Sequence, residues 1–530
     1  MNRQTRLLLL LALAVPMLVM GQERWRYSYG MAGTEDAGEI SCGLGGNIYV
    51  AAKCMNATNT WDFTVISLDP EGNQRWVYRY DGPMERWDDA TCITCSPDGY
   101  IYAAGYSEDT VNLYDITVVC LDTNGVEQWV YRRDWKNDFD RAMDIIRGSD
   151  GNLYVTGSVQ DRTSTGIDLP VISLDPDGNE RWMYVYSESG NGVENASELH
   201  EGPDGNIYVA GVTTPSTSDL TVISLTPDSG HQRWIYQYNG PGNYHDRAQT
   251  LTSDSAGNIY AAGMSWGEGP VRYDIVIIGL NDRGIERWVY RQSGPKDDVI
   301  EDILLGPDGN LYAAGYVTEK PDLPVRMFEV MSIDTAGTEL WVYKDFEGGC
   351  YDLAYGQDDN LYAAGYTTYP NFTKYTALSL DPAGNGRWIY RYAGQGAVNS
   401  ARSIVCPPDG YVYSTGYENG ILTGMDVAVI SLTTAVGVEP GREPRDAEPV
   451  RAPTFFTDRI FLNFEAESSS PVSFCLYALD GSRVLSRTFD RAGTELVVRD
   501  PGLAELPAGV YLGTVSVPGR PICDLKLVKQ

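Results

Sequence analysis

The sequence predicts an all-β chain built from eight copies of one repeat. Gly-Asn-Ile-Tyr-Val-Ala-Ala at 46–52 recurs in seven further copies, and the central tyrosines stand 50 to 54 residues apart. A second element, Thr-Val-Ile-Ser-Leu-Asp at 64–69, also occurs eight times, and a third places a Trp in every copy. Self-similarity at a fixed period is typical of repeat architectures, so it decides the fold before any single motif does.

Each element is short, rich in β-branched and aromatic residues, and bounded by Gly, Pro, Asn or Asp, which indicates a strand. A weaker fourth element precedes each Tyr motif, as in Arg-Ala-Met-Asp-Ile-Ile at 141–146, so each copy is expected to be a four-stranded antiparallel sheet. Residues 22–436 allow about 52 residues per copy, the size of one propeller blade. We therefore predict an eight-bladed β-propeller over 22–436. A parallel β-helix is the alternative, but its coils are much shorter.

The ends of the repeat region predict how the ring closes. Trp25 comes before any other element, whereas the last copy ends at its third strand, 428–432. We expect the strand around Trp25 to complete the last blade. The periodic tryptophans are Trp25, Trp76, Trp129, Trp182, Trp234, Trp288, Trp341 and Trp388.

Composition and the first residues narrow the functional classes. Acidic residues number 72 against 40 basic ones, a net charge of −32, which excludes nucleic acid as a partner. Only three His are present, so general-base and metal chemistry have few candidates. Arg3 and Arg6 precede an apolar run that ends in Val-Met-Gly at 19–21, which predicts a signal peptide over 1–21. No later stretch is long and apolar enough to span a membrane, so an exported, soluble monomer is expected.

The C-terminal part lacks the repeat. Residues 437–453 are rich in Pro and charge and predict an extended linker. Residues 454–530 predict a small β-sandwich, with strands at 472–479, 483–488, 495–498, 510–517 and 525–528. Among the nine cysteines, an odd number for an oxidising compartment, Cys475 and Cys523 could form a disulfide in this tail.

Two resemblances add to these predictions. The strand Asp-Gly-Asn-Ile-Tyr-Val-Ala-Gly (204–211) and the turn Asp-Gly-Asn-Glu-Arg-Trp (177–182) resemble the SBBP-type bacterial propeller repeat. The turn Leu-Asp-Pro-Glu-Gly-Asn-Gln-Arg-Trp (68–76) is also similar to the tryptophan-docking motif of eight-bladed quinoprotein dehydrogenases and BamB-like scaffolds, although most copies are one residue shorter. Both resemblances imply that the periodic Trp packs between neighbouring blades.

The tail resembles the type A sorting domain of the type IX secretion system. The matching segments are Leu-Tyr-Ala-Leu-Asp-Gly-Ser-Arg-Val (476–484), Leu-Pro-Ala-Gly-Val-Tyr-Leu (506–512) and Lys-Leu-Val-Lys (526–529). This resemblance implies that 454–530 engages the type IX secretion machinery, that the protein reaches the cell surface or is secreted, and that the tail is removed. An ordinary immunoglobulin-like accessory domain is the alternative.

Strand order predicts where a ligand binds. The longer second-to-third strand connections (53–61, 106–114, 264–273 and 316–326) and the links between blades lie on one face, which we call the loop face. Six acids precede the innermost strands there: Glu35, Asp88, Asp140, Glu194, Asp246 and Asp298, with Gly348 and Asn399 in the other two copies. A second series precedes the third strands: Asp62, Asp115, Asp168, Asp219, Asp274 and Asp426. These carboxylates could bind Ca²⁺ or a cationic ligand, or each could cap backbone amides, which recurrence in most copies favours.

Residues that break the repeat are better binding candidates. Four extra tryptophans, Trp61, Trp87, Trp135 and Trp266, fall in loop-face connections, where they could stack on a sugar or peptide or fold down as a lid. Cys42, Cys95 and Cys406 share one position in consecutive blades, but their spacing is not a zinc pattern. Gly-Met-Ser-Trp-Gly (263–267) matches the nucleophile-elbow pattern but lacks the following helix, so no catalytic residue is predicted.

These observations predict a non-enzymatic binding or scaffold module for a protein or glycan. No cofactor is predicted, and Ca²⁺ is the ion that the carboxylates could bind. An enzyme on the same scaffold is the alternative, either a quinoprotein-like dehydrogenase or a glycan-cleaving enzyme that uses loop-face carboxylates. The sequence lacks the adjacent Cys-Cys pair of the methanol-type quinoproteins. A structural protein without a specific ligand is the third alternative.

Overall fold

The computed structural model divides into two compact units, Met1–Gly437 and Val438–Gln530. In the first unit it describes residues 19–434, apart from 21, 31–32, 57, 59, 85, 110–112, 137, 161–165, 189–191, 215–216, 268–271, 320–324, 370–371, 395 and 420–423. In the second unit it describes the strand backbones between 450 and 529 and residues 503 and 506. The expected signal peptide and linker lie almost wholly outside the described residues.

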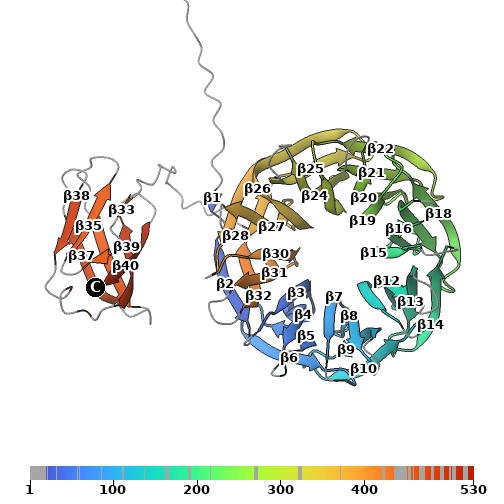
Figure 1. The fold of residues 1–530 in the computed structure, drawn as a ribbon, viewed down its shortest axis with the longest axis horizontal. Coiled ribbons are helices and arrows are strands. Elements are labelled where there is room, and N and C mark those ends of the chain that lie inside the picture. The colour runs from blue at the N-terminus through green and yellow to red at the C-terminus, as the bar shows by residue number, and fades with distance from the viewer. Residues whose placement is uncertain are drawn as a thin grey trace, which may run out of the picture. The chain divides into compact units, whose positions relative to one another are not determined.

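Antiparallel sheets of four strands make up most of the first unit, as the sequence predicts, and Figure 1 shows them side by side around a common centre. The first three contain β3 (Asp36–Cys42), β4 (Ile48–Met55), β5 (Trp61–Leu68) and β6 (Gln74–Tyr80); β7 (Asp88–Cys95), β8 (Ile101–Glu108), β9 (Tyr114–Leu121) and β10 (Glu127–Arg133); and β11 (Arg141–Arg147), β12 (Leu153–Gln160), β13 (Ile167–Leu174) and β14 (Glu180–Tyr186). The next two contain β15 (Asn195–Glu201), β16 (Ile207–Thr213), β17 (Asp219–Leu225) and β18 (Gln232–Tyr238); and β19 (Asp246–Ser253), β20 (Ile259–Trp266), β21 (Tyr273–Leu280) and β22 (Glu286–Gln292). A single 3₁₀ turn, Leu44–Gly46, joins β3 to β4.

One long strand joins the following two groups of strands into an eight-stranded sheet. The sheet contains β23 (Val299–Leu305), β24 (Asn310–Thr318), β25 (Arg326–Asp334), β26 (Glu339–Tyr355), β27 (Leu361–Tyr369), β28 (Phe372–Leu380), β29 (Gly386–Tyr392) and the short β1 (Val19–Met20). The first half of β26 pairs with β25 and its second half pairs with β27. β26 therefore serves as the outermost strand of one group and the innermost strand of the next.

Strands from opposite ends of the repeat region form the last sheet. β30 (Ser400–Val405), β31 (Tyr411–Asn419) and β32 (Met425–Thr433) are joined by β2 (Glu23–Tyr29), which pairs antiparallel with β32. The expected pairing of the Trp25 strand with the strand at 428–432 is thus present, with Trp25 opposite Ser431.

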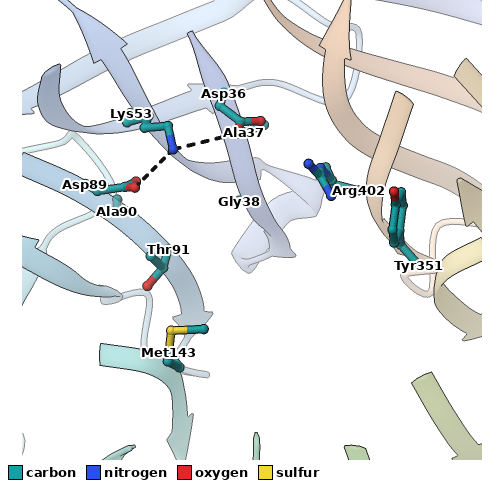
Figure 2. A pocket seen from close by; sticks show the side chains of 10 residues that line it. All are labelled: Asp36, Ala37, Gly38, Lys53, Asp89, Ala90, Thr91, Met143, Tyr351 and Arg402. Carbon is teal, nitrogen blue, oxygen red and sulfur yellow. Dashed lines mark hydrogen bonds and ion pairs between the residues drawn. The ribbon is translucent and has the colours of Figure 1, made fainter. Parts of the chain in front are cut away.

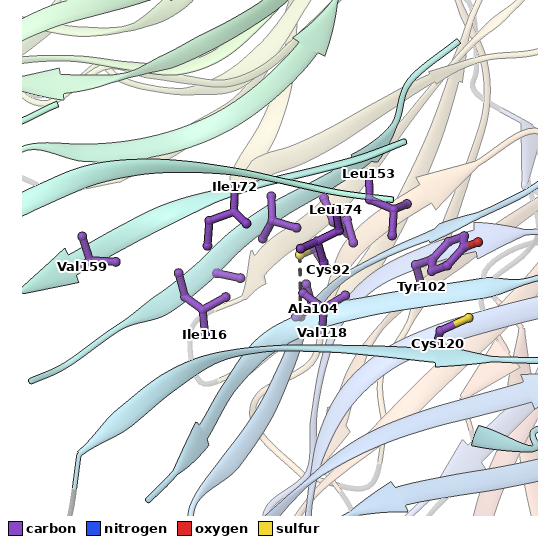
Figure 3. Packing of buried hydrophobic residues seen from close by; sticks show 13 residues of the cluster. Cys92, Tyr102, Ala104, Ile116, Val118, Cys120, Leu153, Val159, Ile172 and Leu174 are labelled. Atoms are coloured by element: carbon purple, nitrogen blue, oxygen red, sulfur yellow. Dashed lines mark hydrogen bonds between the residues drawn. The ribbon is translucent and has the colours of Figure 1, made fainter. Parts of the chain in front are cut away.

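Apolar side chains fill the space between neighbouring sheets. Figure 3 shows one such layer, in which Ile116 and Val118 of β9 face Ile172 and Leu174 of β13. The second strand of each sheet is buried on both faces, which explains why its sequence is a run of small and β-branched residues. The burial holds each sheet against the next and leaves the innermost strands around the centre.

The periodic Trp and the turn of the next sheet form a repeated contact. The indole Nε1 of Trp129 donates to the carbonyl of Pro176 at 3.0 Å, and its ring lies against Gly178 in the same turn. Seven of the eight periodic tryptophans make this hydrogen bond to the turn before the outermost strand of the next group of strands, and Trp25 donates to Pro70 at 2.9 Å. Each Trp also packs on a Tyr of its own sheet's second strand, with ring centroids 5.7 to 5.9 Å apart.

Trp388 is the exception, and the chain ends explain it. The sheet that follows it has β32 and β2 as its outer pair, and no turn connects strands that come from opposite ends of the sequence. Trp388 is fully buried, and its Nε1 has no hydrogen-bond partner among the described residues. Tyr390 instead crosses this boundary and donates to Glu23 of β2.

The second unit contains two sheets. One has β33 (Val450–Arg451), β35 (Arg459–Phe464) and β38 (Glu495–Arg499), and the other has β34 (Phe455–Phe456), β36 (Val472–Ala478), β37 (Arg483–Phe489), β39 (Gly509–Ser516) and β40 (Cys523–Lys529). All five predicted strands are present within two residues at either end, and β35 is a strand that the sequence analysis missed.

The register of this unit argues against the disulfide suggested for Cys475 and Cys523. Cys475 pairs with Thr514 and Cys523 pairs with Val515, so β39 lies between the two cysteine strands. Two strand spacings amount to about 9.5 Å, which exceeds the Cα separation that a disulfide bridges. The suggested pairing was therefore wrong.

Candidate ligand-binding site

The innermost strands surround a central cavity of about 300 Å³. A β-bulge follows a small residue near the start of most of these strands, as at Ala142, and it turns the next polar residue toward the cavity. Besides Glu301, five carboxylates reach it in this way: Glu39, Asp144, Glu198, Asp302 and Asp352. We call them the inner carboxylates.

Each inner carboxylate accepts a backbone N–H from the next innermost strand, as Asp144 does from Leu199 at 2.7 Å and Asp352 from Ile404 at 2.7 Å. Burial raises the pKa of all five, and the pKa of Asp144 rises to about 6. Mutual repulsion adds to the effect, as between Asp302 and Asp352. These carboxylates therefore link neighbouring sheets, and burial makes each of them harder to ionise than a carboxyl group in water.

A second cavity, of about 470 Å³, lies beside the first and carries more varied chemistry (Figure 2). On one wall, Lys53 Nζ lies 3.7 Å from Asp36 and 3.4 Å from Asp89. Arg402 and Tyr351 stand together on the opposite wall, and Met143 and Thr91 line the space between. Because Asp36 begins β3 and Lys53 lies near the end of β4, this cavity belongs to the loop-face half of the unit. We call it the mouth cavity.

One of the four extra tryptophans, Trp61, lies beside Lys53 of the mouth cavity, and a second, Trp87, packs on Trp61; neither lines the cavity itself. The rings of Trp61 and Trp87 meet edge to face, with centroids 4.7 Å apart. Lys53 Nζ lies 5.6 Å from the Trp61 centroid, and Trp61 Nε1 donates to the carbonyl of Thr34 at 2.9 Å. Trp87 is 44% exposed, so one member of the pair is anchored and the other presents its ring to solvent.

The other two extra tryptophans are placed differently. Trp135 is half-buried and packs on the apolar layer between the second and third sheets. Trp266 lies among Tyr244, His245 and Tyr273, with its ring 5.0 Å from Tyr273 and 5.1 Å from Tyr244. The structure therefore brings together Trp61 and Trp87 only, and Trp135 has the packing of a lid.

The first acid series is occupied with backbone hydrogen bonds. Asp88 accepts from Gly82 and Glu108, and Asp246 accepts from Gly240 and Trp266. Asp140, Glu194 and Asp298 accept backbone N–H groups in the same way, and Glu35 is fully buried. Asn399 makes the equivalent bonds to Gly394 and Asn419. The neutral amide of Asn399 accepts the same hydrogen bonds, so the position does not require a charge. We therefore interpret this acid series as capping groups for backbone N–H groups.

The second acid series pairs with arginines where they are available. Asp62, Asp115 and Asp274 lie 2.9, 2.6 and 2.9 Å from Arg79, Arg132 and Arg291 of the adjoining fourth strand. At the positions that match these arginines, the fourth strands beside Asp168, Asp219 and Asp426 carry Val185, Gln237 and Ser28. Among the described residues, no group of three or more His, Cys, Asp or Glu side chains is arranged to hold a metal ion.

The three matching cysteines lie on the opposite face. Cys42 and Cys95 line a cavity of about 460 Å³ with proline and glycine residues. Cys406 directly precedes Pro407, which lines the same cavity. Burial raises the pKa of all three thiols, to about 11 for Cys95, so they are held in the unreactive thiol form. Ser265 of the elbow-like sequence is buried inside β20, opposite Asp274, and not in a turn.

The sequence analysis missed Lys53, Tyr351, Arg402 and the inner carboxylates. The available signal was a polar or charged residue one or two positions after the small residue of the fourth element, as in Ala-Arg-Ser-Ile at 401–404. Such residues interrupt an otherwise apolar strand. A β-bulge allows this interruption because it directs the polar side chain toward the central cavity.

No family model matches the chain, and no curated protein sequence matches it. The described residues contain no helix long and apolar enough to cross a membrane.

Three solved structures are similar in fold. A europium-containing methanol dehydrogenase is 12% identical, covers 78% of this chain and 93% of its own, and has a TM-score of 0.50. A quinohemoprotein alcohol dehydrogenase from Comamonas testosteroni is 12% identical, covers 82% and 78%, and has a TM-score of 0.50. The Dos1 propeller is 11% identical, covers 79% and 96%, and has a TM-score of 0.51. Together with the four-stranded sheets, these likenesses show a β-propeller fold.

Proposed function

We propose that the chain is a non-enzymatic binding module whose ligand, a glycan or protein segment, docks on the loop face at the mouth cavity. The observation that carries this proposal is the position of Lys53. This residue lines the 470 Å³ cavity, and its Nζ also lies near the ring of Trp61, which packs against Trp87. The volume lies in the range of small-ligand sites, and an exposed aromatic face beside polar groups suits sugars and peptide side chains.

We infer further that the propeller has eight blades. The division of β26 between two groups of strands supports this count, because it turns the eight-stranded sheet into two blades. The central cavity also receives residues from eight innermost segments, the last being β30. The Trp25 bond to Pro70 and the Tyr390 bond to Glu23 link the β2 sheet to both of its neighbours.

For export we propose the route that the tail resemblance implies. Residues 1–21 direct export, and 454–530 act as a sorting domain for the type IX machinery that is removed at the cell surface. The separation of the second unit from the first at Gly437 supports a detachable tail. Protein recovered from the native cell surface should end before 454 by mass spectrometry, and full-length protein there would contradict the proposal.

Binding is tested by probing glycan and peptide arrays with the purified full chain. Trp87→Ala should weaken the detected binding about tenfold without lowering the melting temperature, because stacking on an exposed ring contributes roughly 0.5 to 1.5 kcal/mol. Trp135→Ala is the matched control: it should lower the melting temperature and leave binding unchanged, since that ring is packed. If Trp61→Ala and Trp87→Ala both lower the melting temperature and neither changes affinity, the pair is packing and the site lies elsewhere.

A further inference from the structure

Arginines and tyrosines form one continuous row on the loop-face half of the propeller. The Arg402 guanidinium lies 4.9 Å from the Tyr351 ring and 5.3 Å from the Tyr417 ring. The Tyr351 and Tyr366 rings lie 5.7 Å apart, and the Tyr366 hydroxyl is near enough to Arg326 to raise the pKa of that guanidinium. Arg326 in turn lies 3.9 Å over Tyr316. The row, which we call the arginine–tyrosine ladder, comprises Tyr417, Arg402, Tyr351, Tyr366, Arg326 and Tyr316.

The two arginines of the ladder differ from the arginines that pair with the second acid series. Arg79, Arg132 and Arg291 each have a carboxylate within 3 Å. Among the described residues, neither Arg402 nor Arg326 has a carboxylate within 4 Å, although both lie in the field of Glu301. Stacking on tyrosine holds a guanidinium by its faces and leaves its N–H edge available for a planar acceptor. An unpaired, oriented guanidinium in a protein of net charge −32 indicates an anion site.

The mouth cavity supplies the rest of the site. Arg402 and Tyr351 form one wall, while Asp36 and Asp89 on the other wall offer acceptors for hydroxyl groups and Lys53 offers a donor (Figure 2). The inner carboxylates lie directly beyond, since Arg402 and Tyr351 also line the central cavity. Their field disfavours a polyanion but permits one carboxylate at the guanidinium edge.

We propose that the mouth cavity binds a sugar that carries a single carboxylate, a uronic acid, with the carboxylate on Arg402 and the ring against Tyr351. This inference rests on the proposed function and names its ligand class. Guanidinium and carboxylate form a planar two-bond pair. The hydroxyl groups of the sugar meet the polar wall formed by Lys53, Asp36 and Asp89. A sugar meets both walls at once, whereas an isolated carboxylate uses only the first.

The test compares two probes that differ only at C6, methyl β-D-glucuronide and methyl β-D-glucoside, by titration calorimetry with the full chain. The glucuronide should bind about ten- to a hundredfold more tightly, the range for a hydrogen-bonded charged group. Arg402→Met, which keeps an apolar stem, should remove that preference and leave glucoside binding unchanged. Arg402→Lys, which keeps the charge but not the planar fork, should restore part of it. Arg283→Met, in an exposed turn on the other face, is the control for loss of one positive charge.

Several outcomes overturn the inference. Equal binding of the two sugars, an unchanged preference in Arg402→Met, or no glucuronide binding at millimolar concentration each exclude a uronate site. Preference for an acetylated peptide with a free C-terminal carboxylate over the glucuronide would assign the site to protein termini and overturn the sugar. Array binding of neutral glycans that depends on Trp87 but not on Arg402 would keep the proposed function while removing this inference.

Discussion

At the scale of single residues, one glycine in each third-to-fourth strand turn is fixed by the Trp of the preceding blade. Gly178 has φ +83°, and a Cβ there would lie 2.6 Å from the Trp129 ring. Gly205 has φ +73°, but a Cβ there would meet nothing within 4 Å. Both alanine substitutions strain the backbone by about 1 to 2 kcal/mol, whereas only Gly178→Ala also displaces a Trp and its hydrogen bond.

We therefore expect Gly178→Ala to lower the free energy of unfolding by about 1 to 3 kcal/mol more than Gly205→Ala, measured by urea denaturation at one pH. The comparison separates ring contact from backbone strain, because the two sites share the left-handed conformation. Equal losses at the two positions would show that the Trp contact contributes nothing to stability.

Sequence analysis located single residues well where the repeat preserves them and poorly where it does not. The periodic Trp and Tyr were visible because each blade needs the same packing. Arg402 and Tyr351 were not, because the two residues contact each other from different groups of strands: Arg402 lies on β30 and Tyr351 on β26. A contact between blades leaves no local spacing in the sequence.

At the scale of elements, β2 is the strand on which the proposed closure of the ring depends. It pairs with β32 from Glu23 to Tyr29, Arg24 donates to Ser431 at 3.0 Å, and Trp25 contacts the first blade. Without it, β32 would present an unpaired edge, which favours aggregation. A chain that begins at 31 should therefore aggregate or melt many degrees lower, by light scattering and calorimetry. A chain that begins at 22 is the control and should melt like the parent, and equal melting of both truncations would contradict closure by β2.

Element boundaries in the propeller followed from the repeat, but two features of the tail did not. β35 (Arg459–Phe464) has the sequence Arg-Ile-Phe-Leu-Asn-Phe, which is apolar at neighbouring positions and does not alternate as an exposed strand would. The Cys475–Cys523 pairing depended on which strands are neighbours, and sheet order is not encoded in local pattern. Only the register showed β39 between them.

At the scale of the whole molecule, the inner carboxylates couple stability to pH. Burial, and for Glu198 also the charges of Asp302 and Asp144, raises the pKa of these groups above the unfolded values near 4. A group with a raised folded pKa costs nothing at low pH, where both states are protonated. Its cost begins above the unfolded pKa, grows as the pH rises toward the folded pKa, which is about 6 for Asp144, and stays constant above it. Repulsion within a chain of net charge −32 acts in the same direction.

The melting temperature should therefore fall between pH 5 and pH 8, opposite to the behaviour of a protein stabilised by salt-bridged carboxylates. Glu198→Gln keeps a carbonyl oxygen to accept the Leu251 N–H and removes the ionisable group. We expect it to raise the free energy of unfolding at pH 8 by about 1 kcal/mol or more, the equivalent of one pKa unit, and to leave stability near pH 4 little changed. Glu71→Gln, in an exposed turn, removes the same charge from the surface and should change neither value appreciably. A melting temperature that rises from pH 5 to pH 8, or a Glu198→Gln variant destabilised at pH 8, would show that the inner carboxylates are ionised and held by their backbone hydrogen bonds.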